Sequence, residues 1–258
     1  MSDARVEVST SADARRAAIR FFHPKGNIIT AALIARIASA LDQLAANRRL
    51  RLLTIEGDWS DFSFGASVPE HAPDEIDRVL PQAHALVEQL LAFPSPTAAL
   101  VRGRCLGGGF ELALACDFLF AESGATFGLP EIALGVFPPA ACVLLPARVG
   151  LARATAAIVT GAPLEAAAWH DAGLVTAVSA AGRLAGDVEA WFATHLVPRS
   201  AEALRQTIAA ARLGLRDEVR TRLPQLERLY LDTLMKTADA REGVAAFLGK
   251  RRPNWNDC

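Results

Sequence analysis

Residues 101–131 read V-R-G-R-C-L-G-G-G-F-E-L-A-L-A-C-D-F-L-F-A-E-S-G-A-T-F-G-L-P-E, and this stretch decides the fold. The apolar residues 97–101 are typical of a strand, glycines 107–109 predict a tight turn, and residues 110–116 have helical character. A helix that begins at such a turn leaves its first backbone N–H groups without partners. These groups can bind an acyl oxygen on which charge develops, so the turn is a candidate oxyanion hole with Gly108 as one donor.

The three glycines admit other interpretations. A strand-to-helix turn needs glycine wherever φ is positive, whatever its function. A dinucleotide site would need G-x-G-x-x-G, but Glu111 and Leu112 follow the third glycine, so this alternative has weak support. No G-x-S-x-G motif occurs, which leaves a serine hydrolase with little support. No histidine lies beside a serine or cysteine motif, and all are interpreted as surface or structural residues: His23, His71, His84, His170 and His195.

Two carboxylates, Glu111 and Glu131, bracket the glycine turn in the sequence. Glu111 lies in the first turn of an apolar helix, where it could simply complement the helix dipole, and Glu131 could be an exposed cap. Beside a candidate oxyanion hole the pair also fits acid–base catalysis, in which an ionised carboxylate deprotonates water and a carboxylic acid delivers a proton. An apolar pocket would raise the pKa of one of them.

The composition is that of a globular chain. Its 258 residues, 52% hydrophobic and 21% charged, suffice for one large domain or a domain with an extension. The net charge of -1 gives no general attraction for nucleic acid. The four cysteines form no C-x-x-C pair and have no histidine at zinc spacing, so we expect reduced thiols, three of them buried, and no metal site. No apolar run reaches the ~18 residues of a membrane span, and no signal peptide is evident, so the expected location is the cytoplasm.

Strand and helix patterns alternate through the first half of the chain. A helix capped by Thr30 is expected, and a second at residues 76–91, which Pro81 should kink or shorten at its start. This alternation predicts parallel β/α layering. From about residue 183 the pattern is helical throughout, so the C-terminal third is expected to pack on the body or on another subunit. The strands are expected at residues 6–9, 17–22, 51–56, 97–101 and 117–121.

The chain resembles the crotonase, or enoyl-CoA hydratase/isomerase, superfamily over nearly its whole length. The segments that carry the resemblance are V-R-G-R-C-L-G-G-G-F-E-L-A-L-A-C-D, F-G-L-P-E-I-A-L-G-V-F-P-P, G-A-P-L-E-A-A-A-W-H-D-A-G-L-V and R-E-G-V-A-A-F-L-G-K-R-R-P-N-W. The resemblance implies an α/β fold: a crotonase-like spiral of ββα repeats in residues 1–195. It implies a helical region in residues 196–258 that builds a homotrimer or a hexamer. No separate cofactor is expected, because CoA enters as part of the substrate, and neither nucleic acid nor a membrane is an expected partner.

The resemblance also implies roles for single residues. An acyl-CoA would bind with its thioester oxygen between the backbone N–H groups of Ala66 and Gly108. Hydratases of the family carry two glutamates at the positions matched by Glu111 and Glu131, whereas many isomerases, hydrolases and decarboxylases lack one, so water addition is expected. Glu111 would assist the attack of water and Glu131 would exchange the proton at the α or vinylogous carbon, although the sequence leaves open which one leads. The expected substrate and CoA contacts are Lys25, Asn27, Phe64, Ser67, Val68, Phe137, Phe247 and Lys250.

Two segments depart from the family pattern. Ser67 replaces a usual aspartate and Pro69 a frequent lysine, which weakens the CoA phosphate contacts expected on that loop. P-P-A-A-C at residues 138–142 replaces a frequent P-G-A-G-G, so a long, straight acyl chain is not the expected substrate.

The stretches F-S-F-G-A-S-V-P-E-H, L-G-V-F and K-R-R-P-N-W are most similar to one branch of the family. That branch adds water 1,4 across a cyclic conjugated dienoyl thioester in anaerobic aromatic breakdown. The alternatives are a short-chain enoyl-CoA hydratase of fatty-acid β-oxidation and a non-catalytic member that binds acyl-CoA or RNA.

Overall fold

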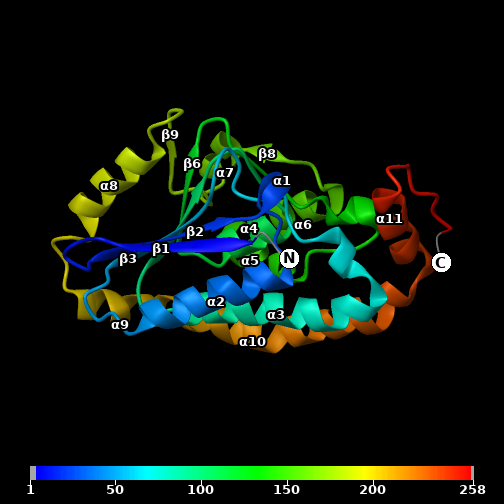
Figure 1. The fold of residues 1–258 in the computed structure, drawn as a ribbon, viewed down its shortest axis with the longest axis horizontal. Helices are drawn as coiled ribbons and strands as arrows, with labels where there is room; N and C mark the ends of the chain where they lie inside the picture. Colours follow the sequence, from blue (N-terminus) through cyan, green and yellow to red (C-terminus); the bar gives the residue numbers. More distant parts are fainter. Residues whose placement is uncertain (1–3, 257–258) are drawn as a thin grey trace.

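Two sheets form the framework of the protein (Figure 1). The structure is a computed structural model that describes residues 4–256, apart from the side chains of Pro73 and Asp74. The larger sheet contains β1 (Arg5–Thr10), β2 (Arg16–Phe22), β3 (Leu52–Gly57), β4 (Thr97–Val101), β6 (Phe118–Glu122) and β9 (Ala177–Ser179), in the spatial order β1-β2-β3-β4-β6-β9. The smaller sheet contains β5 (Arg104–Leu106), β7 (Thr126–Gly128) and β8 (Leu164–Glu165).

The larger sheet confirms the predicted β/α layering. Strands β2, β3, β4, β6 and β9 pair in parallel, and β1 and β2 form an antiparallel hairpin. Every residue of β3 and β4 is buried, because helices cover both faces of the sheet. Successive residues face opposite cores: Leu53 packs toward α2 (Ala31–Ala45), whereas Leu52 packs toward α8 (Leu184–His195).

Helices α2, α3 (Pro73–Ala92) and α10 (Leu213–Arg228) lie along one side of the larger sheet (Figure 1). Thr30 caps α2 as predicted, because its side chain accepts a hydrogen bond from the amide of Leu33. The late start expected from Pro81 is wrong: α3 continues through this proline and begins before residue 76. The packing of α3 against α2 and α10 outweighs the one backbone hydrogen bond that the proline removes.

The remaining helices are short or of moderate length, with 3₁₀ and π-helical turns between some of them. The α-helices are α1 (Pro24–Asn27), α4 (Gly108–Leu114), α5 (Pro139–Val149), α6 (Leu151–Thr160), α7 (Ala166–Asp171), α9 (Ala201–Ala211) and α11 (Ala238–Leu248). The 3₁₀ turns are η1 (Val68–His71), η2 (Pro130–Leu134) and η4 (Leu234–Lys236), and η3 (Leu229–Thr233) is a π-helix. None of the helices in residues 4–256 is both long and apolar enough to cross a bilayer.

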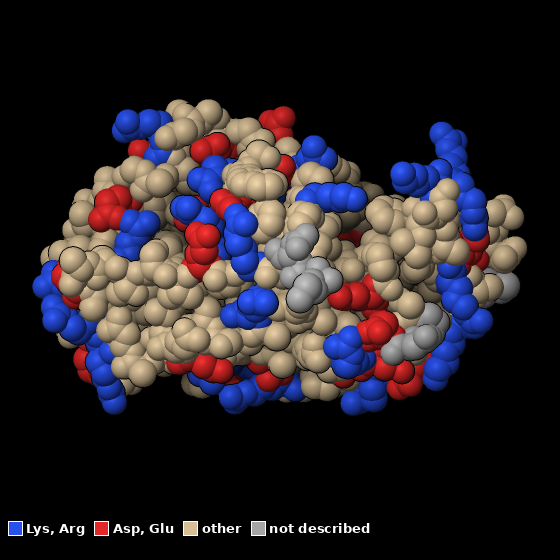
Figure 2. All heavy atoms as spheres, viewed as in Figure 1, with Lys and Arg blue, Asp and Glu red and all other residues tan. Residues whose placement is uncertain are grey.

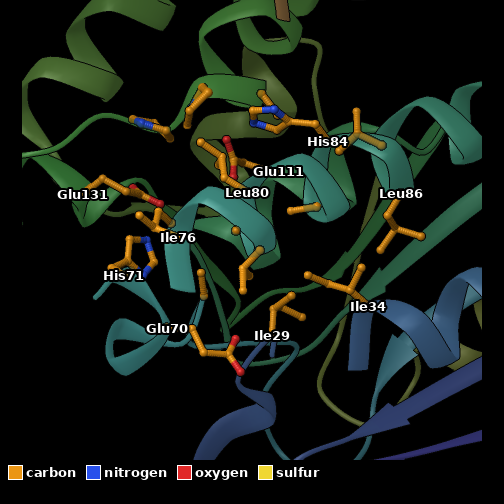
Figure 3. A pocket seen from close by; sticks show the side chains of 18 of the residues that line it. Ile29, Ile34, Glu70, His71, Ile76, Leu80, His84, Leu86, Glu111 and Glu131 are labelled. Atoms are coloured by element: carbon orange, nitrogen blue, oxygen red, sulfur yellow. The ribbon is translucent and has the colours of Figure 1, made fainter. Parts of the chain in front are cut away.

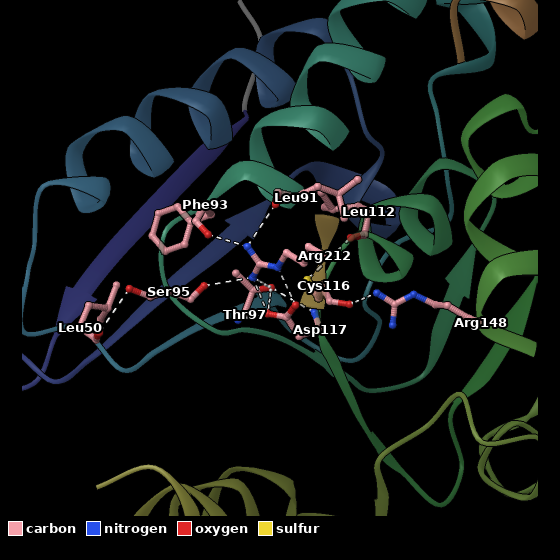
Figure 4. A network of polar contacts seen from close by, with 10 residues as sticks. All are labelled: Leu50, Leu91, Phe93, Ser95, Thr97, Leu112, Cys116, Asp117, Arg148 and Arg212. Carbon is pink, nitrogen blue, oxygen red and sulfur yellow. Dashed lines mark hydrogen bonds and ion pairs between the residues drawn. The ribbon is translucent and has the colours of Figure 1, made fainter. Parts of the chain in front are cut away.

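A buried ion pair joins the C-terminal helices to the body (Figure 4). Arg212, at the junction of α9 and α10, is only 5% exposed, and its guanidinium donates to both carboxylate oxygens of Asp117 at 2.7 and 2.5 Å. The same guanidinium donates to the carbonyls of Leu91, Phe93 and Ser95 at 3.2, 2.5 and 3.1 Å. Because these carbonyls end α3 and lead into β4, one side chain fixes the relative positions of three elements.

The main hydrophobic core extends into the C-terminal region. Val219 and Leu223 of α10 are buried in the same cluster as residues of the sheet and of α3. The C-terminal helices therefore complete the core of this chain, and an additional role of residues 196–258 in assembly stays a prediction. Of the cysteines, Cys105 and Cys116 are buried as expected, Cys142 is half-buried, and Cys258 lies outside the described residues.

Candidate active site

The glycine turn between β5 and α4 is crowded by groups that face it. Gly107 has a left-handed φ of 49°, and a Cβ there would lie 2.4 Å from Oε1 of Glu131. A Cβ on Gly109 would lie 2.4 Å from Cβ of Ser63. Side chains at these positions would displace the carboxylate or the neighbouring loop, so the sequence needs glycine here for both conformation and space.

The two backbone amides that were expected to form the oxyanion hole lie next to each other. A Cβ built on Gly108 would lie 3.4 Å from the amide nitrogen of Ala66. The loop that carries Ala66 is held by Ile29, whose amide donates to the Gly65 carbonyl at 2.9 Å and whose carbonyl accepts from Ser67 at 3.0 Å. Among the backbone hydrogen bonds of residues 4–256, none uses the amide of Ala66 or Gly108 as donor. Both residues line one cavity, so two free donors face it from adjacent positions.

Glu111 and Glu131 line this same cavity (Figure 3). Glu111 projects from α4, and its Oε1 accepts a hydrogen bond from the amide of Ala141 at 2.9 Å. Glu131 projects from η2, and its Oε2 is buried without a hydrogen-bond partner among the described residues. The two carboxylates that are twenty positions apart in sequence therefore meet beside the two free amides, as acid–base chemistry requires.

The surroundings give the two carboxyl groups different proton affinities. Burial raises the pKa of Glu111, while hydrogen bonds from the amides of Ala141 and Ala140 act in the opposite direction. Burial and, to a smaller extent, the charge of Glu111 together raise the pKa of Glu131 to about 8. Glu131 is therefore mainly protonated at neutral pH, whereas Glu111 has backbone hydrogen bonds that favour its ionised form.

The proton on Glu131 makes folding stability depend on pH. Its native pKa of about 8 lies above the ordinary value of 4.5, so the native protein keeps a proton that the unfolded chain has lost. The contribution of the Glu131 proton to the free energy of unfolding is complete below pH 4.5 and is lost as the pH rises toward 8. We expect Glu131→Gln to be more stable than wild type at pH 8, by up to roughly 4 kcal/mol, and similar to it at pH 4.5.

Urea unfolding of both proteins at the two pH values measures this difference. Glu75→Gln, an exposed carboxylate on α3, is the matched control and should show no comparable pH-dependent gain. Equal stability of Glu131→Gln and wild type at both pH values would contradict a proton held by Glu131.

The rest of the cavity wall is largely apolar. Helix α3 contributes one side of it, residues 137–140 contribute another, and Tyr230 closes it from the C-terminal region. Phe137 packs edge-on against Tyr230, with ring centroids 5.4 Å apart. Of the expected contacts, Ser67 and Phe137 line this cavity.

A second cavity adjoins the first and shares Ala66, His71 and Glu131 with it. Three of the expected CoA contacts, Phe64, Val68 and Phe247, line this second cavity. It also includes Arg251, which is paired with Glu242.

Three expected contacts lie elsewhere. Lys25 and Lys250 are exposed and do not belong to the lining of either cavity. Asn27 is buried, and its Nδ2 donates to the carbonyls of Asp58 and Asp61 at 2.7 and 2.8 Å. Its side chain thus joins two loops, and the expected CoA contact of Asn27 is corrected to a structural role.

The cavity lining also includes residues that the sequence did not predict as part of the site, among them His71, His84 and Tyr230. His71 lies between the two cavities, with its Nδ1 2.9 Å from the Ser67 carbonyl, and follows Ala66 by five positions in the quoted motif. Tyr230 is the only tyrosine of the chain and lies in a π-helical turn, a feature that is frequent at functional sites. The hydrogen bonds of His71 and His84 within the fold agree with a structural role, and both residues also line the cavity.

Comparison with known proteins identifies the family of the chain. The family model described as Enoyl-CoA hydratase/isomerase matches residues 13–258. The chain belongs to this family. The resemblance inferred from the sequence is thereby confirmed, together with the crotonase-type fold and the enzyme class, a hydro-lyase acting on acyl-CoA thioesters.

Relatives within the family include several hydratases. The chain is 42% identical over 243 residues to the cyclohexa-1,5-dienecarbonyl-CoA hydratase of Thauera aromatica, covering 93% of this chain and 92% of that protein. It is 32% identical over 234 residues to the 2,3-dehydroadipyl-CoA hydratase of Escherichia coli, covering 89% and 90%. Among solved structures, an enoyl-CoA hydratase from Mycobacterium avium subsp. paratuberculosis superposes with a TM-score of 0.86 at 30% identity and 98% coverage of both chains.

Proposed function

We propose that this enoyl-CoA hydratase family member adds water to a cyclic conjugated dienoyl-CoA, cyclohexa-1,5-diene-1-carbonyl-CoA, in the breakdown of aromatic compounds. The observation that carries the proposal is the meeting of Glu111 and Glu131 in one cavity beside the free amides of Ala66 and Gly108. The similarity to the Thauera aromatica hydratase supports the choice of substrate. We propose the cytoplasm as the compartment.

In the proposed reaction, the amides of Ala66 and Gly108 bind the thioester oxygen. Glu111, whose hydrogen bonds favour its ionised form, removes a proton from water as the water oxygen attacks the β carbon. The electron pair of the broken double bond moves through the conjugated system onto the thioester oxygen, where the two amides stabilise the enolate.

Glu131, which carries the shared proton, then delivers that proton to the vinylogous carbon as the electron pair returns from the oxygen. Transfer of the proton held by Glu111 to Glu131 restores the starting pair. The net change is the addition of one water molecule, and no separate cofactor is needed.

The shape of the site favours a compact acyl group. Pro138, Pro139 and Ala140 line the cavity directly beside Glu111, where glycines would leave more room. Tyr230 and α3 close the wall opposite. This lining supports the proposal of a ring rather than an extended chain as the acyl group.

The second cavity is the proposed CoA side of the site. Phe247 and Arg251 line it, and Figure 2 shows basic side chains gathered at the end of the molecule where α11 and the C-terminal segment lie. An arginine near this entrance suits a phosphate group.

We also propose that the chain forms a homotrimer or a dimer of trimers. Large apolar side chains of its C-terminal half are exposed: Leu151 by 72%, Leu213 by 60% and Leu248 by 52%. A surface of this kind is typical of contact with another subunit. Sedimentation velocity gives the assembly directly.

The choice between ring and chain is tested by assaying the purified protein with cyclohexa-1,5-diene-1-carbonyl-CoA and with crotonyl-CoA. We expect kcat/KM to be at least about 100-fold higher for the cyclic dienoyl-CoA than for crotonyl-CoA. An enclosed apolar pocket that fits the ring should stabilise the transition state of the cyclic substrate by roughly 3 kcal/mol more. Faster turnover of crotonyl-CoA would support the short-chain hydratase instead. Absence of turnover with both thioesters, together with an RNA gel shift at physiological salt, would support the non-catalytic alternative.

A further inference from the structure

One polar group in the apolar wall has no role in the mechanism above. His84 lies on α3, is 6% exposed, and lines the cavity between the apolar residues Ala83 and Val87. In Figure 3 its ring extends from the helix into the cavity, on the same side as Glu111. A histidine at such a position needs hydrogen-bond partners for both ring nitrogens.

The first ring nitrogen has a partner on another helix. Nδ1 of His84 lies 2.7 Å from Oε2 of Glu227, which projects from α10. A carboxylate can only accept, so Nδ1 carries the hydrogen. Burial lowers the pKa of His84, and its hydrogen bond with Glu227 opposes this only in part. A neutral ring that donates through Nδ1 leaves Nε2 as a hydrogen-bond acceptor.

The second ring nitrogen has no partner. Nε2 of His84 is buried and accepts no hydrogen bond from the described residues. An acceptor left in this state in an apolar wall is unfavourable, whereas one that meets a donor of a bound ligand contributes to binding and to selectivity. Because the pair with Glu227 fixes the orientation of the ring, Nε2 is a preformed recognition point.

We propose that His84 is a specificity-determining residue of the acyl pocket whose Nε2 accepts a hydrogen bond from a hydroxyl group on the acyl moiety, with Glu227 as its positioning residue. The pocket then binds a hydroxylated acyl-CoA, such as the product of hydration, more tightly than the same acyl group without the hydroxyl. This inference rests on the proposed function, because it places the acyl group of a thioester in this cavity. An acceptor also discriminates against a ketone, which has no hydrogen to donate.

The test compares the dissociation constants of three kinds of ligand by calorimetry: cyclohexanecarbonyl-CoA, its 2-, 3- and 4-hydroxy derivatives, and the corresponding oxo derivatives. We expect wild type to bind at least one hydroxy derivative about 10-fold more tightly than the parent compound, cyclohexanecarbonyl-CoA. One additional hydrogen bond lowers the dissociation constant by about this factor. The oxo derivatives should gain nothing over the parent. The 2-hydroxy compound is measured with Glu131→Gln so that it is not dehydrated during the titration.

Variants separate recognition from folding. His84→Phe should abolish the preference for the hydroxy derivative and leave binding of the parent within about 2-fold, because the ring volume is nearly kept. If His84→Phe does not fold, Glu227→Ala supplies the test and should reduce the preference by about 3-fold or more. Glu88 is exposed and affects His84 only through its charge. Glu88→Ala is therefore the matched control and should keep the preference.

The outcomes distinguish this inference from the proposed function. If wild type binds the parent but shows no preference for any hydroxy derivative, or if His84→Phe keeps the preference, the inference is overturned and the proposed function stands. Equal gains for hydroxy and oxo derivatives would also overturn it, because they would require Nε2 to be a donor. If wild type binds none of these thioesters, the proposed function itself fails.

Discussion

Replacing either Glu111 or Glu131 by Gln is expected to lower kcat by a factor of about 10² to 10⁴, the range that general acid–base groups contribute. Each change keeps the size of the side chain but removes the ability to exchange a proton. Because the two amides of the oxyanion hole belong to the backbone, binding of a saturated acyl-CoA should change by less than about 3-fold. Steady-state kinetics with the cyclic dienoyl-CoA and calorimetry with cyclohexanecarbonyl-CoA measure the two quantities.

The pH dependence of kcat/KM, which reports the pKa values of the free enzyme, adds a second measure of the same pair. Wild type should lose activity as the pH rises through about 8, where Glu131 loses the proton that it delivers. It should also lose activity at acid pH, at a value above the ordinary 4.5 because burial raises the pKa of Glu111.

Glu75→Gln is again the control and should keep both kcat and its pH profile. Retained turnover in Glu111→Gln or Glu131→Gln would remove that residue from the mechanism. Loss of acyl-CoA binding in step with turnover would show that the residue holds the site in shape and does not transfer protons.

Arg212→Leu is expected to destabilise the protein by about 3–5 kcal/mol, the range found when one partner of a buried ion pair is removed. The change would leave the carboxylate of Asp117 buried beside an apolar side chain, and three carbonyls would lose their donor. Arg212→Lys keeps the charge but cannot reproduce the planar fork of donors, so we expect an intermediate loss. Urea unfolding at neutral pH measures both changes.

The neighbouring Arg220→Leu is the matched control for this result. Arg220 is exposed on α10, and its replacement should change the free energy of unfolding by less than about 0.5 kcal/mol. A loss in Arg212→Leu as small as this would mean that the network of Figure 4 contributes little beyond packing.

The parts of the fold that the sequence predicts are those set by neighbouring residues. The strand at 97–101, the glycine turn and the carboxylate in the first helical turn follow one another along the chain, so their local patterns sufficed. Thr30 was predicted as a cap for the same reason. The unbroken α3 was not predicted, because the contacts that support it through Pro81 come from α2 and from the distant α10.

The parts of the site that the sequence did not predict depend on contacts across the fold. His84 is 143 positions from Glu227 in sequence, and no local motif joins them. The position of Tyr230 in the cavity depends on a π-helical turn, which shifts the side chains that follow it relative to a regular helix. Asn27 was assigned to CoA from its loop, whereas its partners Asp58 and Asp61 lie in another loop some thirty positions away.

The binding of Arg212 to the end of α3 limits how this protein can be recombined with its relatives. A crossover placed near residue 200 would combine the C-terminal helices of one parent with the α3 and β4 of another. Such a chimera would mismatch the guanidinium with its carbonyl acceptors and Glu227 with residue 84. Exchanging residues 73–117 together with residues 201–236 keeps the carbonyl acceptors, Asp117 and residue 84 in the same parent as Arg212 and Glu227. Libraries built on that rule should yield more folded proteins.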